Sequence, residues 1–196
     1  MIENFQGTIV CASKYFDGAQ LRSIYEQGFH DFGENRTHVL LERKKELDDL
    51  SVIWHFIGHL QSNKVKTIIN ELDYLHTLDR LSLAKTIQKY RETPLKCFIQ
   101  VNLTEESQKS GVDPNNLPDF LFELKKYDKI EVIGFMTMGK LDDKVVTERA
   151  FKQLKALQDT YQLPSLSMGM TDDYELAIQY GTTHLRIGRK FYELLK

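Results

Sequence analysis

The stretch of residues 8–18, TIVCASKYFDG, decides between the two folds that the rest of the sequence allows. Its first six residues form an apolar run of the kind that builds a buried strand. An open, doubly wound α/β sheet carries a glycine-rich turn directly after its first strand. The segment ASKYFDG is not such a turn. The stretch therefore favours a closed barrel over an open sheet.

Short apolar or β-branched runs recur along the chain at fairly even intervals. They cover residues 8–13, 31–35, 52–58, 74–78, 96–103, 131–138, 165–170 and 184–188. The charged segments between them have helical periodicity. In residues 147–161 the apolar positions share one face of the predicted helix: Phe151, Leu154, Leu157 and Tyr161.

Apolar strands that alternate with amphipathic helices indicate a parallel sheet covered by helices, and eight such units close a (β/α)8 barrel. We therefore expect residues 1–196 to form one TIM barrel domain, because no linker or repeat divides the chain. With 196 residues the chain lies at the short end for this fold, so its helices and loops must be short.

The bulk composition limits the partners. The net charge of −2 favours neither nucleic acid nor an anionic membrane. Cys11 and Cys97 both lie inside apolar runs, which indicates two buried thiols in a reducing compartment. No signal peptide is visible, and no apolar run approaches the roughly 20 residues that span a bilayer. We expect a cytoplasmic protein.

Polar residues follow most of the predicted strands. In a (β/α)8 barrel the carboxyl ends of the strands form one face, where active sites lie. The polar residues predicted for this face are Lys14, Glu34, Asn35, His55 to His59, Asn102, Thr137, Ser167 to Thr171 and Arg186 to Arg189.

The last two units, SMGMTDD (167–173) and RIGRK (186–190), resemble a phosphate site. Glycine lets backbone N–H groups approach an anion, and a helix that begins at Thr171–Asp172 or after Gly188 would direct its amino terminus there. A plain helix cap at Thr171 is the alternative, but it leaves Ser167 and Gly169 without a role. The two roles can coexist.

Lys14 faces this predicted phosphate pocket across the barrel mouth. Burial would disfavour its ammonium form and leave a nucleophilic amine, so a Schiff base with a phosphorylated aldehyde or ketose is one interpretation. The alternative is a lysine at a strand end whose ammonium group reaches water. No metal site is expected, because the context of His55 and His59 spoils a helical metal pair.

Several motifs together resemble the pyridoxal-phosphate homeostasis protein family. They are VCASKYF, FGENR, WHFIGHLQSNK, HTLDR, IQVNLTEESQKSGV, GFMTMG, LSMGMTDDYELAI and LRIG, and they run in order from Thr8 to Gly188. The family is similar in fold to the N-terminal barrel domain of bacterial alanine racemase.

The resemblance implies a role for each matching residue. Lys14 would hold pyridoxal 5′-phosphate as an internal aldimine, and Asn35 would line the cofactor near its ring. Ser167 would hold the phosphate, helped by the turn from Gly169 to Thr171. Gly188 and the residue after it would offer backbone N–H groups to the same phosphate. Arg186 would face the pyridine nitrogen.

Two departures from the family pattern concern the ends of the match. The family has a helix before the first strand, which we expect to be shortened or absent here because residues 1–7 precede the strand. The family continues RIG with a threonine, where this chain has Arg189. We expect that arginine to pair with the phosphate by charge.

The resemblance predicts a cofactor-binding protein with no catalytic residue, one that serves intracellular storage and delivery of pyridoxal phosphate to apoenzymes. A permanently charged arginine beside the ring nitrogen opposes protonation of the ring and weakens it as an electron sink. We expect a monomer with no nucleic-acid or membrane partner. Two alternatives stay open: an amino-acid racemase that uses His55 or Tyr15 as its second base, and a divergent regulatory protein that no longer binds the cofactor.

Overall fold

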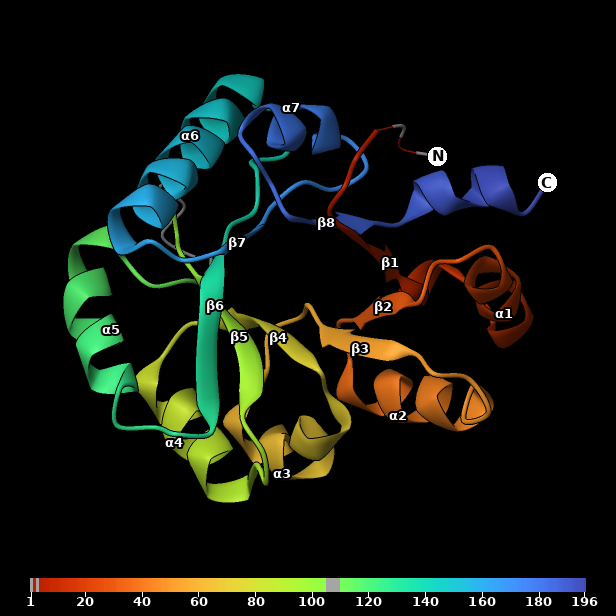
Figure 1. The fold of residues 1–196 in the computed structure, drawn as a ribbon, viewed down its shortest axis with the longest axis horizontal. Coiled ribbons are helices and arrows are strands. Elements are labelled where there is room, and N and C mark those ends of the chain that lie inside the picture. Colours follow the sequence, from red (N-terminus) through yellow and green to blue (C-terminus); the bar gives the residue numbers. More distant parts are fainter. Residues whose placement is uncertain (1, 3, 105–109) are drawn as a thin grey trace.

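Eight parallel strands form a closed barrel in chain order, β1 to β8, in the computed structural model, which describes residues 2, 4–104 and 110–196 (Figure 1). The strands are β1 (Thr8–Ala12), β2 (Asp31–Glu34), β3 (Ile53–Phe56), β4 (Tyr74–Leu78), β5 (Leu95–Gln100), β6 (Ile130–Met136), β7 (Ser165–Ser167) and β8 (His184–Ile187). The barrel closes where β1 pairs with β8. The predicted (β/α)8 barrel is confirmed, and the open sheet is wrong.

Helices surround the strands on the outside of the barrel (Figure 1). They are α1 (Gly18–Glu26), α2 (Thr37–Glu46), α3 (Val65–Ile68), α4 (Leu81–Tyr90), α5 (Leu117–Leu124), α6 (Lys144–Tyr161) and α7 (Tyr174–Gln179). Short 3₁₀ helices complete the connections: η1 (Ser13–Tyr15), η2 (Ser62–Lys64), η3 (Ile69–Glu71), η4 (Pro114–Asn116) and η5 (Arg189–Leu194). The predicted apolar face of α6 packs on the barrel, with Phe151 and Leu154 fully buried.

The end of the seventh unit differs from the expectation. Strand β7 ends at Ser167, because the chain turns at Gly169, whose φ of +96° is a conformation that favours glycine. The helix expected at Thr171–Asp172 begins three residues later, at Tyr174, with Asp173 as its N-cap residue. The Asp173 carboxylate accepts a hydrogen bond from the Met170 amide (2.6 Å) and so keeps residues 170–173 in a turn.

Both cysteines are buried and unbridged, as predicted. Burial raises the pKa of each thiol, so both are neutral, inert side chains of the core. No helix in residues 2, 4–104 and 110–196 has the length and apolar character that would let it cross a membrane. Residues 105–109, which belong to the motif IQVNLTEESQKSGV, lie outside the described residues.

Aromatic rings fill the inside of the barrel. His55 stacks on Tyr74, with ring centroids 4.4 Å apart and planes 4° apart. His76 stacks on Phe98 at 4.6 Å, and His184 meets Phe98 edge-on at 4.9 Å. Three histidines therefore share one interior. Within the described part of the chain, no group of three or more His, Cys, Asp or Glu side chains is arranged to hold a metal ion.

All three interior histidines resist protonation. Burial is the main cause that lowers the pKa of His55, of His76 and, to about 4, of His184. The unfolded chain, in which a histidine pKa is near 6.5, therefore binds more protons than the folded chain below that pH. Stability contributed by these neutral rings is complete above pH 6.5 and is lost as the pH falls through the lowered pKa of each ring, which is about 4 for His184.

We predict that the free energy of unfolding falls between pH 6.5 and 5, by up to about 1.4 kcal/mol per pH unit for each of the three histidines. Urea unfolding at several pH values measures this slope. His184→Gln should reduce it, whereas His38→Gln, at an exposed position of α2, should leave it unchanged. A free energy that stays constant over this range would contradict the prediction.

Candidate functional site

Lys14 lies in η1, the turn that follows β1 at the carboxyl end of the barrel. Ser13, the residue before Lys14, fixes this turn to β2. Its buried hydroxyl donates to Glu34 Oε1 (2.7 Å) and lies 2.9 Å from the Gly33 carbonyl oxygen. Lys14 is therefore carried on backbone that is tied to the end of β2.

The rest of the turn is fixed from the side. The Tyr192 hydroxyl, from η5, donates to the Tyr15 carbonyl at 2.7 Å. Arg43 of α2 donates through Nη2 to the Phe16 carbonyl, also at 2.7 Å. The Phe16 ring is 3% exposed. Three elements that are distant in sequence thus fix the residues next to Lys14.

The Lys14 side chain itself is exposed, so the burial that the sequence analysis assumed for its amine is wrong for this structure. Its Nζ lies 5.0 Å from the centre of the Tyr15 ring. The Glu34 carboxylate is the buried acid close to it. Burial raises the pKa of Glu34, and the Ser13 hydrogen bond and the positive charge of Lys14 oppose that rise. The side chain of Lys14 is therefore exposed, while the backbone on which it is carried is fixed by hydrogen bonds.

Thr171 and Gly188 meet next to this turn. The Gly188 amide donates to Thr171 Oγ1 at 3.3 Å, which places a backbone donor and a hydroxyl side by side. A Cβ on Gly188 would lie 2.3 Å from the Tyr15 ring, so only glycine allows β8 to end against the lysine turn. The turn that carries Lys14 therefore packs against Gly188 through Tyr15, and Gly188 in turn bonds to Thr171.

Gly169 supports this corner from within the fold. A Cβ at this position would lie 2.6 Å from side-chain atoms of both Ala177 and Leu185. The Gly169 carbonyl accepts the Arg186 amide at 2.9 Å. Gly169 therefore allows the chain to turn before Thr171, and its bond to the Arg186 amide fixes the position of this turn relative to β8.

Ser167 lies deeper in the barrel than the other predicted phosphate contacts. It pairs with His184, four residues before Gly188 along β8. Its side chain is fully buried, and its Oγ contacts His76 Nδ1 (2.7 Å) and Arg186 Nη1 (2.5 Å). The Ser167 hydroxyl therefore bonds to His76 and Arg186, whereas Thr171 and Gly188 bond to each other.

Arg186 is 5% exposed and is held at two points, by Ser167 Oγ and by the Thr137 carbonyl, which accepts from Nη2 at 3.0 Å. Burial lowers the pKa of Arg186 to about 10, and the negative charge of Asp173 opposes this shift. The guanidinium is still protonated at neutral pH. It provides a fixed positive charge inside the barrel, close under the mouth.

Two further predicted residues have partners of their own. Arg189 is exposed, and its guanidinium forms an ion pair with Asp172 at 2.8 Å. The backbone of Asn35 is fixed between the Glu34 carboxylate, which accepts its amide at 3.2 Å, and Gly58, where a Cβ would lie 2.3 Å from the Asn35 carbonyl oxygen. The backbone of Asn35 is thus held directly after β2, at the carboxyl end of the barrel.

Sequence reasoning missed His76, although it predicted the strand that carries it. The alternation of residues along 74–78 is the signal that could have found it, because every second side chain of a barrel strand points inward. His55, which the racemase alternative uses as a base, is fully buried and bonded to Asp31 and His76. It is therefore not available to a substrate at the mouth.

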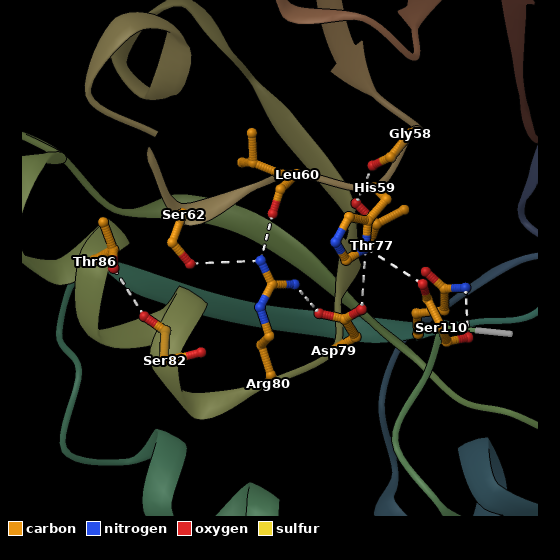
Figure 2. Close-up of polar contacts among 11 residues, drawn as sticks. Gly58, His59, Leu60, Ser62, Thr77, Asp79, Arg80, Ser82, Thr86 and Ser110 are labelled. Atoms are coloured by element: carbon orange, nitrogen blue, oxygen red, sulfur yellow. Dashed lines mark hydrogen bonds and ion pairs between the residues drawn. The ribbon is translucent and has the colours of Figure 1, made fainter. Parts of the chain in front are cut away.

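The loops after β3 and β4 brace another part of the rim (Figure 2). Arg80 donates to the Leu60 carbonyl (2.6 Å) and pairs with Asp79 (2.5 Å), which is almost buried. His59 Nδ1 lies 3.5 Å from Asp79 and 3.3 Å from Ser110 Oγ. The motifs WHFIGHLQSNK and HTLDR thus serve, at least in part, to hold the rim together.

Comparison with known proteins identifies the family to which this chain is similar. The model of the alanine racemase N-terminal domain matches residues 17–195. A pyridoxal phosphate homeostasis protein of Aquifex aeolicus is 37% identical over 187 residues, which cover 90% of this chain and 82% of the relative. A protein of the same name from Pseudomonas aeruginosa is 35% identical, with 94% and 83% covered.

Solved structures agree with this assignment. PipY from Synechococcus elongatus, in a structure with PLP bound, is 30% identical and superimposes with a TM-score of 0.87 over 95% of this chain and 92% of its own. Alanine racemase from Corynebacterium glutamicum shares the fold, with a TM-score of 0.76 at 16% identity over 95% of this chain and 55% of the enzyme. The chain belongs to the pyridoxal phosphate homeostasis protein family, whose barrel is that of the alanine racemase N-terminal domain.

Proposed function

We propose that this protein binds pyridoxal 5′-phosphate at the barrel mouth, covalently through Lys14, and that it stores and delivers the cofactor inside the cell. One observation carries the proposal: the exposed Lys14 lies on a fixed turn whose next residue, Tyr15, packs against Gly188 of the Thr171–Gly188 donor pair. The printed names of the relatives, and the PLP bound in the PipY structure, support the same ligand.

The mouth fits an aldehyde that carries a phosphate. The free amine of Lys14 attacks the aldehyde carbon, the C=N bond of a Schiff base replaces the C=O bond, and the oxygen leaves with both amine hydrogens as water. The backbone is fixed before Lys14 by Ser13 and after it at Tyr15 and Phe16, which orients the amine without ordering a loop on binding. The exposure of the side chain lets the water depart.

We assign the phosphate to the Thr171 hydroxyl and the Gly188 amide. In the absence of an anion these two groups bond to each other, and a phosphate oxygen offers a stronger acceptor to both. The Ser167 hydroxyl is already engaged with His76 and Arg186, so we assign it to the arginine rather than to the phosphate. Arg189, already paired with Asp172, has at most an auxiliary role.

Arg186 and Asn35 complete the proposed site. Arg186 faces the pyridine nitrogen as a permanent cation, so the ring stays unprotonated and is a weak electron sink. Asn35 lines the cofactor near its ring. A ring held in this state suits a protein that carries the cofactor rather than one that turns over amino acids, and the names of the relatives point to the same role.

The recipients we propose are apoenzymes that depend on pyridoxal phosphate. A Schiff base exchanges with any primary amine, so a cofactor on an exposed lysine is transferable without a dedicated release mechanism. The mouth is formed within one chain among the described residues, which fits a monomeric carrier.

The first prediction concerns Lys14. Purified protein mixed with pyridoxal phosphate should show a visible absorbance band that borohydride shifts, because reduction converts the C=N bond to an amine. Lys14→Ala should abolish the band. Lys14→Arg, which keeps the positive charge but cannot form the bond, should abolish it as well, whereas Lys64→Ala should keep it. Protein that stays colourless with the cofactor, or a band that survives in both Lys14 variants, would refute the proposal.

The second prediction separates the two candidate phosphate ligands. Thr171→Val keeps the side-chain shape but removes the hydroxyl, and it should weaken cofactor binding on the order of tenfold or more, the value of a hydrogen bond to a charged group. Arg189→Ala removes an exposed, paired charge and should change affinity by less than about fivefold. Equilibrium titration with the cofactor measures both. A larger loss of affinity in Arg189→Ala than in Thr171→Val would contradict this assignment and identify Arg189 as the phosphate ligand.

The third prediction concerns catalysis. Prolonged incubation of the cofactor-loaded protein with L-alanine should give no more D-alanine than the Lys14→Ala variant, as measured by chiral chromatography. The reason is that His55 is buried away from the mouth, and Tyr15, whose ring packs on Gly188, is fixed by the turn. Inversion above the control level, and its loss in Tyr15→Phe, would instead establish a racemase.

A further inference from the structure

A continuous chain of hydrogen bonds crosses the inside of the barrel below the proposed site. Arg186 Nη1 lies 2.5 Å from Ser167 Oγ, which lies 2.7 Å from His76 Nδ1. His76 Nε2 lies 2.8 Å from His55 Nδ1, and His55 Nε2 lies 2.9 Å from Asp31 Oδ1. Every member except Asp31 is buried. Asp31 opens β2, at the amino-terminal end of the barrel.

The arginine end favours one direction of the hydrogen-bond chain. A guanidinium can only donate, so Ser167 Oγ accepts from Arg186. The hydroxyl hydrogen is used when it points to His76 Nδ1, the other hydrogen-bond partner of Ser167 Oγ. A neutral His76 that accepts at Nδ1 carries its proton on Nε2. It therefore donates from Nε2 to His55 Nδ1.

The carboxylate end dictates the same direction independently. An ionised carboxylate can only accept, so His55 carries its proton on Nε2 and donates it to Asp31. His55 then accepts at Nδ1, which is what His76 requires. Both ends agree, and every contact of the chain is satisfied with both imidazoles neutral. The lowered pKa values of His55 and His76 fit this state.

Two hydrogen bonds hold the Arg186 guanidinium, one within this hydrogen-bond chain and one outside it. Nη1 points to Ser167 at the end of β7, and Nη2 donates to the Thr137 carbonyl, directly after β6. Two directed bonds fix the plane of a rigid, planar group, whereas one bond leaves it free to rotate. Loss of the Ser167 bond would therefore release the orientation of Arg186, although its charge would remain.

We propose that Ser167, His76 and His55 are positioning residues that hold the Arg186 guanidinium in one orientation toward the cofactor ring, with Asp31 locking both histidines as Nε2–H tautomers. The proposal rests on the proposed function for its ligand. The direction of the chain does not, because it is a property of the protein alone.

The first arm of the test uses the protein without cofactor. Long-range ¹H–¹⁵N correlation spectra of ¹⁵N-histidine-labelled protein at pH 7.5 should show His55 and His76 as neutral Nε2–H tautomers, assigned by their loss in His55→Phe and His76→Phe. A cationic ring, or an Nδ1–H tautomer at either position, would overturn the proposal. This arm keeps its meaning even if the protein binds no pyridoxal phosphate.

The second arm measures the cofactor with a matched pair of variants. His76→Phe keeps an aromatic ring against Phe98 but breaks the chain. His184→Phe makes a similar change in the same interior, where His184 has its hydrogen bond to Thr183 Oγ1 (2.8 Å) outside the chain. His76→Phe should shift the absorbance maximum of the bound cofactor and weaken its binding by about tenfold. His184→Phe should leave the maximum in place and the affinity within about twofold.

Equal effects of the two variants on the absorbance maximum would show a merely structural role and overturn the proposal. Ser167→Ala should behave like His76→Phe, because it breaks the adjacent bond. If one chain variant fails to fold, the other and the tautomer spectra still decide. Failure of the wild-type protein to bind pyridoxal phosphate would refute the proposed function, and with it the ring-facing role, while the tautomer result would stand.

Discussion

The pairing of the first strand with the last is the constraint on which the site depends. Val10 pairs with Arg186, and Cys11 pairs with Ile187. This register fixes where β8 ends relative to the end of β1. Because of that register, the turn carrying Lys14 meets Gly188, and a Cβ at this glycine would strike the Tyr15 ring. A shift of two residues would separate the amine from the donors proposed for the phosphate. The closure of the barrel is therefore also what assembles the site.

The barrel separates two electrostatic environments that both act on the proposed cofactor. The mouth is open, and its charges, such as the Arg189–Asp172 pair, are exposed and weakly coupled to binding. The interior is buried, and Arg186, the buried cation among the described residues, connects there through neutral groups to the Asp31 carboxylate. Charges in such an interior act strongly because water does not screen them. The proposed chemistry needs both environments, an accessible amine above and a fixed cation below.

Most of the fold could be predicted, because each strand of a buried parallel barrel is a short apolar run that stands out from charged helices. The strand at 74–78 was predicted to the residue, and the site residues at strand ends followed from topology. Depth in the barrel could not be predicted, because it depends on register between strands. Register therefore also decides how Ser167, which pairs with His184, stands relative to the turn from Gly169 to Thr171. The exposure of Lys14 and the pairing of Arg189 with Asp172 depend on loop packing, which periodicity does not encode.

The central claim is that the amine of Lys14 is the attachment point for pyridoxal phosphate. Borohydride reduction of the protein mixed with the cofactor, followed by proteolysis and peptide mass mapping, tests it most directly. The account predicts one dominant reduced adduct, on the peptide that contains Lys14. An adduct spread over exposed lysines, or concentrated on a peptide away from η1, would contradict it.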